Sequence, residues 1–253
     1  MAHSLANSES WSTLTEWTTA RIAMGRVGAS LPTKPLLDFN MDHARARDAV
    51  HTVLNVTMLS ESLREHGFIP MHAYSQVRNR SEYLRRPDLG RLLHPDCVTP
   101  LTQVPAQHSK RITTVVADGL SALAPTQHAL PMLLRLRDAL PDWELDIVLA
   151  TNARVALADD IGEIRGAEMA LIFIGERPGL KSPDSLGAYL TYRPRRGRMD
   201  SERNCVSNIR TEGLSYNEAA FRLTHLIRSA ESMGLSGTQL KDDSDSLPFA
   251  LEP

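Results

Sequence analysis

The loop at 175–179 (Gly-Glu-Arg-Pro-Gly) places two opposite charges, Glu176 and Arg177, between two glycines and directly after an apolar run. Glycine and proline define a tight backbone path, so the Glu176 carboxylate should project from a fixed position. An ionised carboxylate only accepts hydrogen bonds, which suits a ligand rich in amide N–H groups. The alternative is a structural turn with a solvated ion pair of little energetic value. The position at a strand end favours ligand contact.

Cys205 is a second candidate, in the segment Arg-Asn-Cys-Val-Ser-Asn-Ile at 203–209. A nucleophilic cysteine needs a lowered pKa and a nearby base, and His225 is the only candidate base in this part of the chain. A lone cysteine is more often a small buried hydrophobe. We interpret Cys205 in that way, which is compatible with contact to an apolar ligand face, and not as a nucleophile.

Asp118, Ser121 and Glu163 could serve acid–base chemistry in a stand-alone hydrolase, but no base-orienting histidine accompanies them. Asp118 follows an apolar run and is adequately explained as a helix N-cap or a turn residue. The chain has no Gly-x-Gly-x-x-Gly fingerprint, no phosphate loop of the Gly-Lys-Ser type and no Gly-x-Ser-x-Gly elbow. The histidines and cysteines lack metal-ligand spacing. We therefore assign no catalytic residue and no protein metal site.

The elements that would position these residues alternate between strands and helices from residue 111 onward. Apolar and β-branched runs predict buried strands at 112–117, 145–150 and 169–174. A fourth candidate strand lies at 188–192. Helical spacing predicts helices at 120–140, 158–166 and 217–233. This alternation indicates an α/β fold: a mainly parallel Rossmann- or flavodoxin-like sheet covered by helices on both faces. In such sheets, functional groups gather in loops after the carboxyl ends of strands.

The N-terminal part is predicted to be helical. Apolar spacing from Trp11 to Met24 predicts one helix, ended by Gly25, and spacing from Leu36 to Leu63 predicts another. The segment at 83–91 is irregular and basic and enters a short helix. The expected organisation is a helical region at 1–105, an α/β domain at 106–237 and a polar tail at 238–253 that we expect to be disordered.

Composition excludes several classes of function. The chain has 253 residues, a net charge of −2 and 5% aromatic residues, which argues against a nucleic-acid or anionic-membrane surface. No apolar run approaches the roughly 20 residues of a membrane span, and the polar residues at 1–12 do not resemble a secretory signal. Two cysteines cannot build a disulfide framework, so we expect a cytoplasmic protein.

Several motifs occur in unbroken order along most of the chain, from about Ala20 to Met233. They include Arg-Arg-Pro-Asp-Leu-Gly-Arg at 85–91, Asp-Gly-Leu-Ser at 118–121, Arg-Val at 154–155, Asp-Ile-Gly-Glu-Ile-Arg-Gly-Ala at 160–167 and Ser-Pro-Asp-Ser-Leu-Gly-Ala-Tyr at 182–189. Together with the loop at 175–179 and the segment at 203–209, they closely resemble the light (small) subunit of ethanolamine ammonia-lyase. The last two motifs are specific in combination, and either alone would be weak.

The resemblance implies one subunit of a hetero-oligomeric lyase that converts ethanolamine to acetaldehyde and ammonia with adenosylcobalamin. It implies that a large subunit binds the substrate and that cobalamin lies between the two subunits, where its chemistry is radical chemistry supplied by the cofactor. Carried over by position, the cofactor-binding residues of this chain are Val155, Glu176 and Cys205, all in the α/β domain. We expect Val155 and Glu176 in loops at strand ends and Cys205 in a later loop.

Two further points stay open. Many relatives have a longer N-terminal extension associated with packing into a protein-shelled bacterial microcompartment, whereas this chain reaches the matching segment almost at once, so encapsulation is an open alternative to the free cytoplasm. The main alternative function is a stand-alone α/β protein that binds a nucleotide or another small ligand. That alternative leaves the motifs at 175–179 and 205–209 unexplained.

Overall fold

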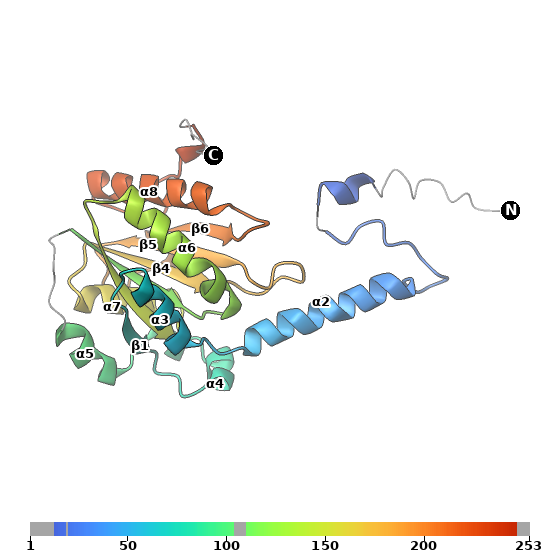
Figure 1. The fold of residues 1–253 in the computed structure, drawn as a ribbon, viewed down its shortest axis with the longest axis horizontal. Helices are drawn as coiled ribbons and strands as arrows, with labels where there is room; N and C mark the ends of the chain where they lie inside the picture. The colour runs from blue at the N-terminus through green and yellow to red at the C-terminus, as the bar shows by residue number, and fades with distance from the viewer. Residues whose placement is uncertain (1–12, 19, 104–109, 247–253) are drawn as a thin grey trace.

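The computed structural model describes residues 13–18, 20–103 and 110–246, and a six-stranded sheet lies at its centre (Figure 1). The strand order is β1-β3-β2-β4-β5-β6. The first four strands in this order pair in parallel, and β5 is antiparallel to both β4 and β6. The strands are β1 (Met71–Tyr74), β2 (Arg111–Ala117), β3 (Glu144–Thr151), β4 (Met169–Gly175), β5 (Leu186–Tyr192) and β6 (Arg203–Ile209).

Helices cover the sheet on two sides. One face packs against α3 (Val56–Glu65), α6 (Leu123–Ala139) and α8 (Tyr216–Met233), whose apolar residues form the larger core cluster. The other face packs against α5 (Val98–Gln103) and α7 (Leu157–Ile164) in a smaller cluster. The predicted α/β class with a mainly parallel sheet is confirmed, and the sheet is mixed because β5 runs opposite to the other strands.

The three strongest predicted strands are confirmed as β2, β3 and β4. Every residue of β2 and β4 and most residues of β3 are buried, so their apolar runs were easy to recognise. The fourth candidate is confirmed as β5. The sequence pattern missed β1, which has four residues, and β6, in which buried and exposed residues are mixed. A strand covered on one face only does not show a continuous apolar run.

The shorter elements fill the connections. They are α4 (Arg80–Arg85) and the 3₁₀ turns η2 (Leu89–Arg91), η3 (Pro95–Cys97), η4 (Asp200–Glu202) and η5 (Ser244–Ser246). The prediction for 83–91 was partly wrong, because a helix precedes the irregular residues there and a 3₁₀ turn follows them.

The N-terminal arm, which we define as residues 13–52, departs most from prediction. The helix predicted from Trp11 to Met24 is wrong: Trp11 lies outside the described residues, only η1 (Thr13–Glu16) is helical, and Ala23 has a φ of 56°. The long helix α2 (Thr33–His51) extends away from the sheet (Figure 1). The single helix predicted from Leu36 to Leu63 is instead two helices, because the chain turns at 52–55 before α3.

The polar tail also differs from prediction over its described part. Leu240 is buried, and the Asn204 side chain donates to its carbonyl oxygen at 2.7 Å. Asn204 also accepts from the Gly237 N–H at 2.7 Å. Further along, Ser244 is buried and Asp245 pairs with Arg222 at 2.6 Å. The tail therefore packs on the body as far as Ser246 and the expectation of disorder was wrong there, while residues 247–253 lie outside the described part of the chain. The division into three regions stays a prediction.

Candidate functional site

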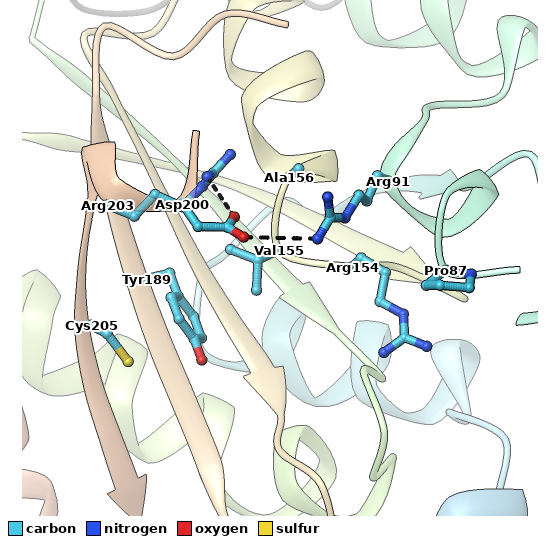
Figure 2. A pocket seen from close by; sticks show the side chains of 9 residues that line it. All are labelled: Pro87, Arg91, Arg154, Val155, Ala156, Tyr189, Asp200, Arg203 and Cys205. Atoms are coloured by element: carbon cyan, nitrogen blue, oxygen red, sulfur yellow. Dashed lines mark hydrogen bonds and ion pairs between the residues drawn. The ribbon is translucent and has the colours of Figure 1, made fainter. Parts of the chain in front are cut away.

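Two cavities of about 390 and about 470 Å³ adjoin each other at the carboxyl edge of the parallel strands. They share Arg154, Val155 and Tyr189, and we call the two together the trough. Cys205 lines the first cavity and Glu176 the second. Figure 2 shows the first cavity, with Val155 lying between Tyr189 and the arginines of its rim. The structure therefore brings all three residues implied by the resemblance to one place.

The backbone before Val155 is held by Asp118, which is buried at the end of β2. Its carboxylate accepts from the N–H groups of Asn152 at 2.9 Å and Ala153 at 3.1 Å, and from Arg80 Nη1 at 3.2 Å. Asn152 has a φ of 53°, so the loop turns sharply after β3. The interpretation of Asp118 as a turn residue is confirmed, because the Ser121 N–H donates to its carbonyl oxygen at 3.1 Å. Its interpretation as a helix N-cap is wrong, because α6 starts at Leu123 without a side-chain cap. The Asp118 side chain instead connects the ends of β2 and β3 through hydrogen bonds.

The backbone before Glu176 is fixed by close approach of two strand ends. Gly119 has a φ of 53°, and a Cβ there would lie 2.2 Å from the Gly175 carbonyl oxygen. A Cβ on Gly175 would lie 1.9 Å from the Ser121 carbonyl oxygen. Leu120 N–H donates to the Gly175 carbonyl at 2.8 Å. Only glycine fits at both positions, so the Glu176 loop begins from a constrained point.

The Glu176 carboxylate is half-buried and held on one side. Oε2 accepts from the Ser185 hydroxyl at 2.5 Å and from the Asn208 N–H at 3.4 Å. A Cβ on Gly187 would lie 3.0 Å from Oε1, so the glycine leaves space for this carboxylate. The expected location of Glu176 after a strand is confirmed. One carboxylate oxygen is thus anchored, and the group can present acceptor capacity to a ligand.

Cys205 lies in strand β6 and is exposed, so its expected loop position and its interpretation as a buried hydrophobe were both wrong. It pairs directly with Tyr189 on β5, and the two side chains share a face of the sheet. Helices α5 and α7 leave this face of β5 and β6 open: Tyr189 is half-buried and lines both cavities. The bare sheet therefore forms a floor for the trough.

The surroundings of the Cys205 thiol disfavour its ionisation. Desolvation by the adjacent side chains raises the pKa of Cys205, the negative charge of Glu176 raises it further, and a side-chain hydrogen bond with Tyr189 partly opposes both effects. Desolvation likewise raises the pKa of Tyr189. The proposed base His225 contacts Asp243 instead, at 2.6 Å. The role of Cys205 as a cofactor contact stays a prediction.

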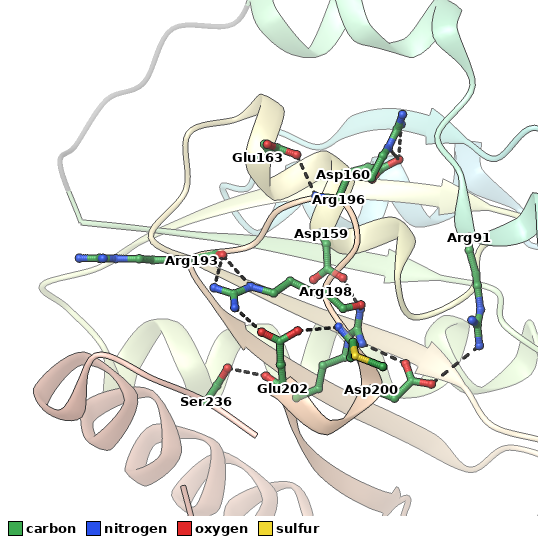
Figure 3. A network of polar contacts seen from close by, with 12 residues as sticks. Arg91, Asp159, Asp160, Glu163, Arg193, Arg196, Arg198, Asp200, Glu202 and Ser236 are labelled. Carbon is green, nitrogen blue, oxygen red and sulfur yellow. Dashed lines mark hydrogen bonds and ion pairs between the residues drawn. The ribbon is translucent and has the colours of Figure 1, made fainter. Parts of the chain in front are cut away.

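A chain of ion pairs forms one wall of the trough (Figure 3). Arg203 donates to Asp200 at 2.9 Å and to Asp159, and Asp200 also faces Arg91 at 3.8 Å. Arg203 and Asp159 are almost fully buried, and desolvation raises the pKa of Asp159 while Arg203 opposes that shift. This wall joins η2, α7 and β6, and it fixes the backbone next to Cys205.

The hydrolase candidates do not form a catalytic group. Asp118 pairs with Arg80, the Ser121 hydroxyl donates to the Pro183 carbonyl at 2.6 Å, and Glu163 accepts from the Arg196 N–H. Among residues 13–18, 20–103 and 110–246, no group of three or more His, Cys, Asp or Glu side chains could hold a metal ion. Within the same residues, no helix has the length and apolarity of a membrane span.

Sequence reasoning missed Tyr189 and Arg154 as site residues. Both were visible in the motifs, Tyr189 as the last residue of the segment at 182–189 and Arg154 next to Val155. The signal for Tyr189 was weak because its role depends on the open face of β5, which follows from the arrangement of the helices. Arg154 was detectable as a charged residue beside a predicted strand-end site.

The fold and the trough define an α/β protein with two adjoining cavities at the carboxyl edge of a mainly parallel sheet, which is where ligand sites lie in such folds. Comparison with known proteins makes the class specific. The model of the family "Ethanolamine ammonia-lyase light chain (EutC)" matches residues 8–241, and the chain belongs to that family.

Curated relatives agree along nearly the full length. A protein of Azotobacter vinelandii named ethanolamine ammonia-lyase small subunit is 51% identical over 245 residues, covering 95% of this chain and 91% of the relative. Small subunits of Pseudomonas putida and Pseudomonas aeruginosa are 49% and 50% identical, each over 93% of this chain and 88% of their own length. The resemblance read from the motifs is confirmed, and the family is that of a lyase subunit.

Proposed function

We propose that the trough holds adenosylcobalamin at an interface with the large subunit of ethanolamine ammonia-lyase, in an enzyme that converts ethanolamine to acetaldehyde and ammonia. The observation that carries the proposal is the convergence of Val155, Glu176 and Cys205 on two adjoining cavities. When bound, the cofactor supplies the radical chemistry. This chain contributes binding and orientation and no acid–base step.

The residues present fit a cobalamin. The open face of β5 and β6 offers a broad surface, as a large planar ring requires, and Val155 and Tyr189 supply apolar contact. The rim of a corrin ring carries amide groups, whose N–H donors suit the Glu176 carboxylate. Gly187 keeps the space beside Glu176 free, because a side chain there would meet Oε1 at 3.0 Å.

The large subunit is proposed to cover the trough together with the apolar side chains of α2. Leu36, Leu37 and Met41 on this helix are 45%, 61% and 56% exposed. The helix contacts the connection between β4 and β5 that begins with Glu176, because Asp42 pairs with Lys181 in this connection at 2.8 Å. One partner surface that seals the cofactor would thus also cover the helix. With both cysteines free, we propose a cytoplasmic enzyme.

Glu176→Gln tests the proposal. The substitution keeps the size of the side chain and removes the charge, so an interaction of roughly 1.5–3 kcal/mol with ligand N–H groups is lost. The assembled complex of the variant with the large subunit should bind adenosylcobalamin about tenfold to hundredfold more weakly in a spectroscopic titration. Assembly, followed by co-purification, should be unchanged.

Glu163→Gln is the matched control, since Glu163 accepts from the Arg196 N–H outside the trough. Its complex should bind the cofactor as the wild type does. Unchanged affinity of the Glu176→Gln complex would reduce Glu176 to a turn residue. Loss of assembly would place Glu176 in the subunit interface instead.

A further inference from the structure

Arg154 lies at the junction of the two cavities and lines both. Its guanidinium group lies 4.2 Å from the centroid of the Tyr83 ring, and its Nη2 donates to the Tyr83 carbonyl at 3.3 Å. The Arg154 N–H donates to the Gly90 carbonyl at 2.8 Å, and a Cβ on Gly90 would lie 3.0 Å from Arg154 Cγ. The side chain is therefore held in one orientation before any ligand binds.

Arg154 differs from the neighbouring arginines in its pairing with carboxylates. Arg91 and Arg203 face Asp200, and Arg80 pairs with Asp118. Arg154 forms no salt bridge with any residue that the structure describes, and its Nε is buried there without a hydrogen-bond partner. Arg177 also lines the second cavity, but it is exposed and therefore hydrated.

A partly desolvated guanidinium without a carboxylate partner carries an unfavourable free energy that an anion would offset. Arginine presents its donors in a rigid fork that matches phosphate oxygens. Adenosylcobalamin carries neutral amides around its ring and one anionic phosphodiester in its nucleotide loop. We propose, on the basis of the function proposed above, that Arg154 binds this phosphate and so orients the cofactor across the trough.

The test separates the phosphate from the rest of the cofactor. Adenosylcobinamide lacks the nucleotide, and adenosylcobinamide phosphate retains only its phosphate group. Binding of each corrinoid to the assembled two-subunit complex is measured by absorbance titration, without turnover. The wild-type complex should prefer the phosphorylated ligand by about tenfold to hundredfold, since the added contact is a charge-assisted hydrogen bond.

Arg154→Gln should reduce this preference to within about twofold, and Arg154→Lys should keep part of it, because a lysine retains the charge but not the fork. Arg137→Gln is the matched control. Arg137 also lies over an aromatic ring, at 5.0 Å from the centroid of Phe68, and also donates to a backbone carbonyl, that of His66 at 2.7 Å, but it lies on α6 outside the trough. Its complex should keep the full preference.

A full preference in the Arg154→Gln complex would overturn the assignment and leave Arg154 as a support for Tyr83. Equal weakening of both ligands would also overturn it, since Arg154 would then contact a neutral part of the corrinoid. Failure of both Arg154 variants to assemble would place the residue in the subunit interface. If the wild-type complex bound neither adenosylcobalamin nor the two truncated corrinoids, the proposed function itself would fail.

Discussion

The arm at 13–52 and the body at 56–246 are stabilised in different ways. In α2, only Asp42 and Ala49 are buried, and the apolar side chains of the helix face outward. The body buries two continuous apolar clusters, one on each face of its sheet. A lone helix of 19 residues gains little from propensity in water. The body is thus stabilised by its own core, whereas α2 leaves most of its apolar side chains exposed.

The largest expected effect comes from the core. Phe173→Ala removes a fully buried ring from β4 and should lower the free energy of unfolding by about 3–5 kcal/mol. Phe39→Ala on α2, where the ring is 37% exposed, should change it by less than about 1 kcal/mol. Urea unfolding of the two purified variants measures both values. Similar losses would mean that the arm belongs to the cooperative core.

Two glycines extend the same comparison to the backbone. Gly119 and Gly28 have φ values of 53° and 60°, but a Cβ on Gly28 would meet nothing within 4 Å. Gly119→Ala should cost about 1–2 kcal/mol for the left-handed conformation and a further 1–3 kcal/mol for the clash with Gly175. Gly28→Ala should leave the thermal midpoint of the body within about 2 °C, because the arm unfolds separately. Equal shifts in the two variants would contradict this separation.

The smallest expected effect concerns the rates at which iodoacetamide modifies the two cysteines. Cys97 is buried, whereas Cys205 is exposed in the trough with a raised pKa. Iodoacetamide should therefore modify Cys205 first, but more slowly at pH 8 than an unstructured cysteine, because the thiolate is the reacting form. Glu176→Gln removes a negative charge that raises this pKa and should accelerate the modification severalfold. Mass spectrometry of the modified peptide gives the rates, and an unchanged rate would show that Glu176 does not act on the thiol.

The sequence predicted the elements that are stabilised within the body. The strands β2, β3 and β4 are buried on both faces, so their apolar runs are continuous and unambiguous. The first part of the arm was mispredicted because the periodicity of Trp17, Ile22 and Met24 carries no information about whether a surface is present to pack against. The helical character expected after Leu36 is confirmed by α2. Cys205 was misplaced for a related reason: β6 is covered on one face only, and its exposed residues made it look like a loop.

The residues of the candidate site could be predicted from the sequence, but their arrangement in space could not. Glu176 could be placed at a strand end from local sequence, and the motifs carried Val155 and Cys205. The pairing of Cys205 with Tyr189 depends on the antiparallel pairing of β5 with β6, which no local pattern specifies. The hydrogen bond from the Ala153 N–H to Asp118 joins residues 35 positions apart in sequence, so it also depends on the folded sheet.

Hydrogen exchange of the assembled complex tests the central claim most directly, because the partner and the cofactor should protect different regions. Adding the large subunit to this chain should slow amide exchange in α2. Adding adenosylcobalamin to the assembled complex should slow it further at 152–156, 176–180 and 203–208, the segments that carry Val155, Glu176 and Cys205. Protection by the cofactor elsewhere in this chain, with these segments unchanged, would contradict the assignment of the trough as its site.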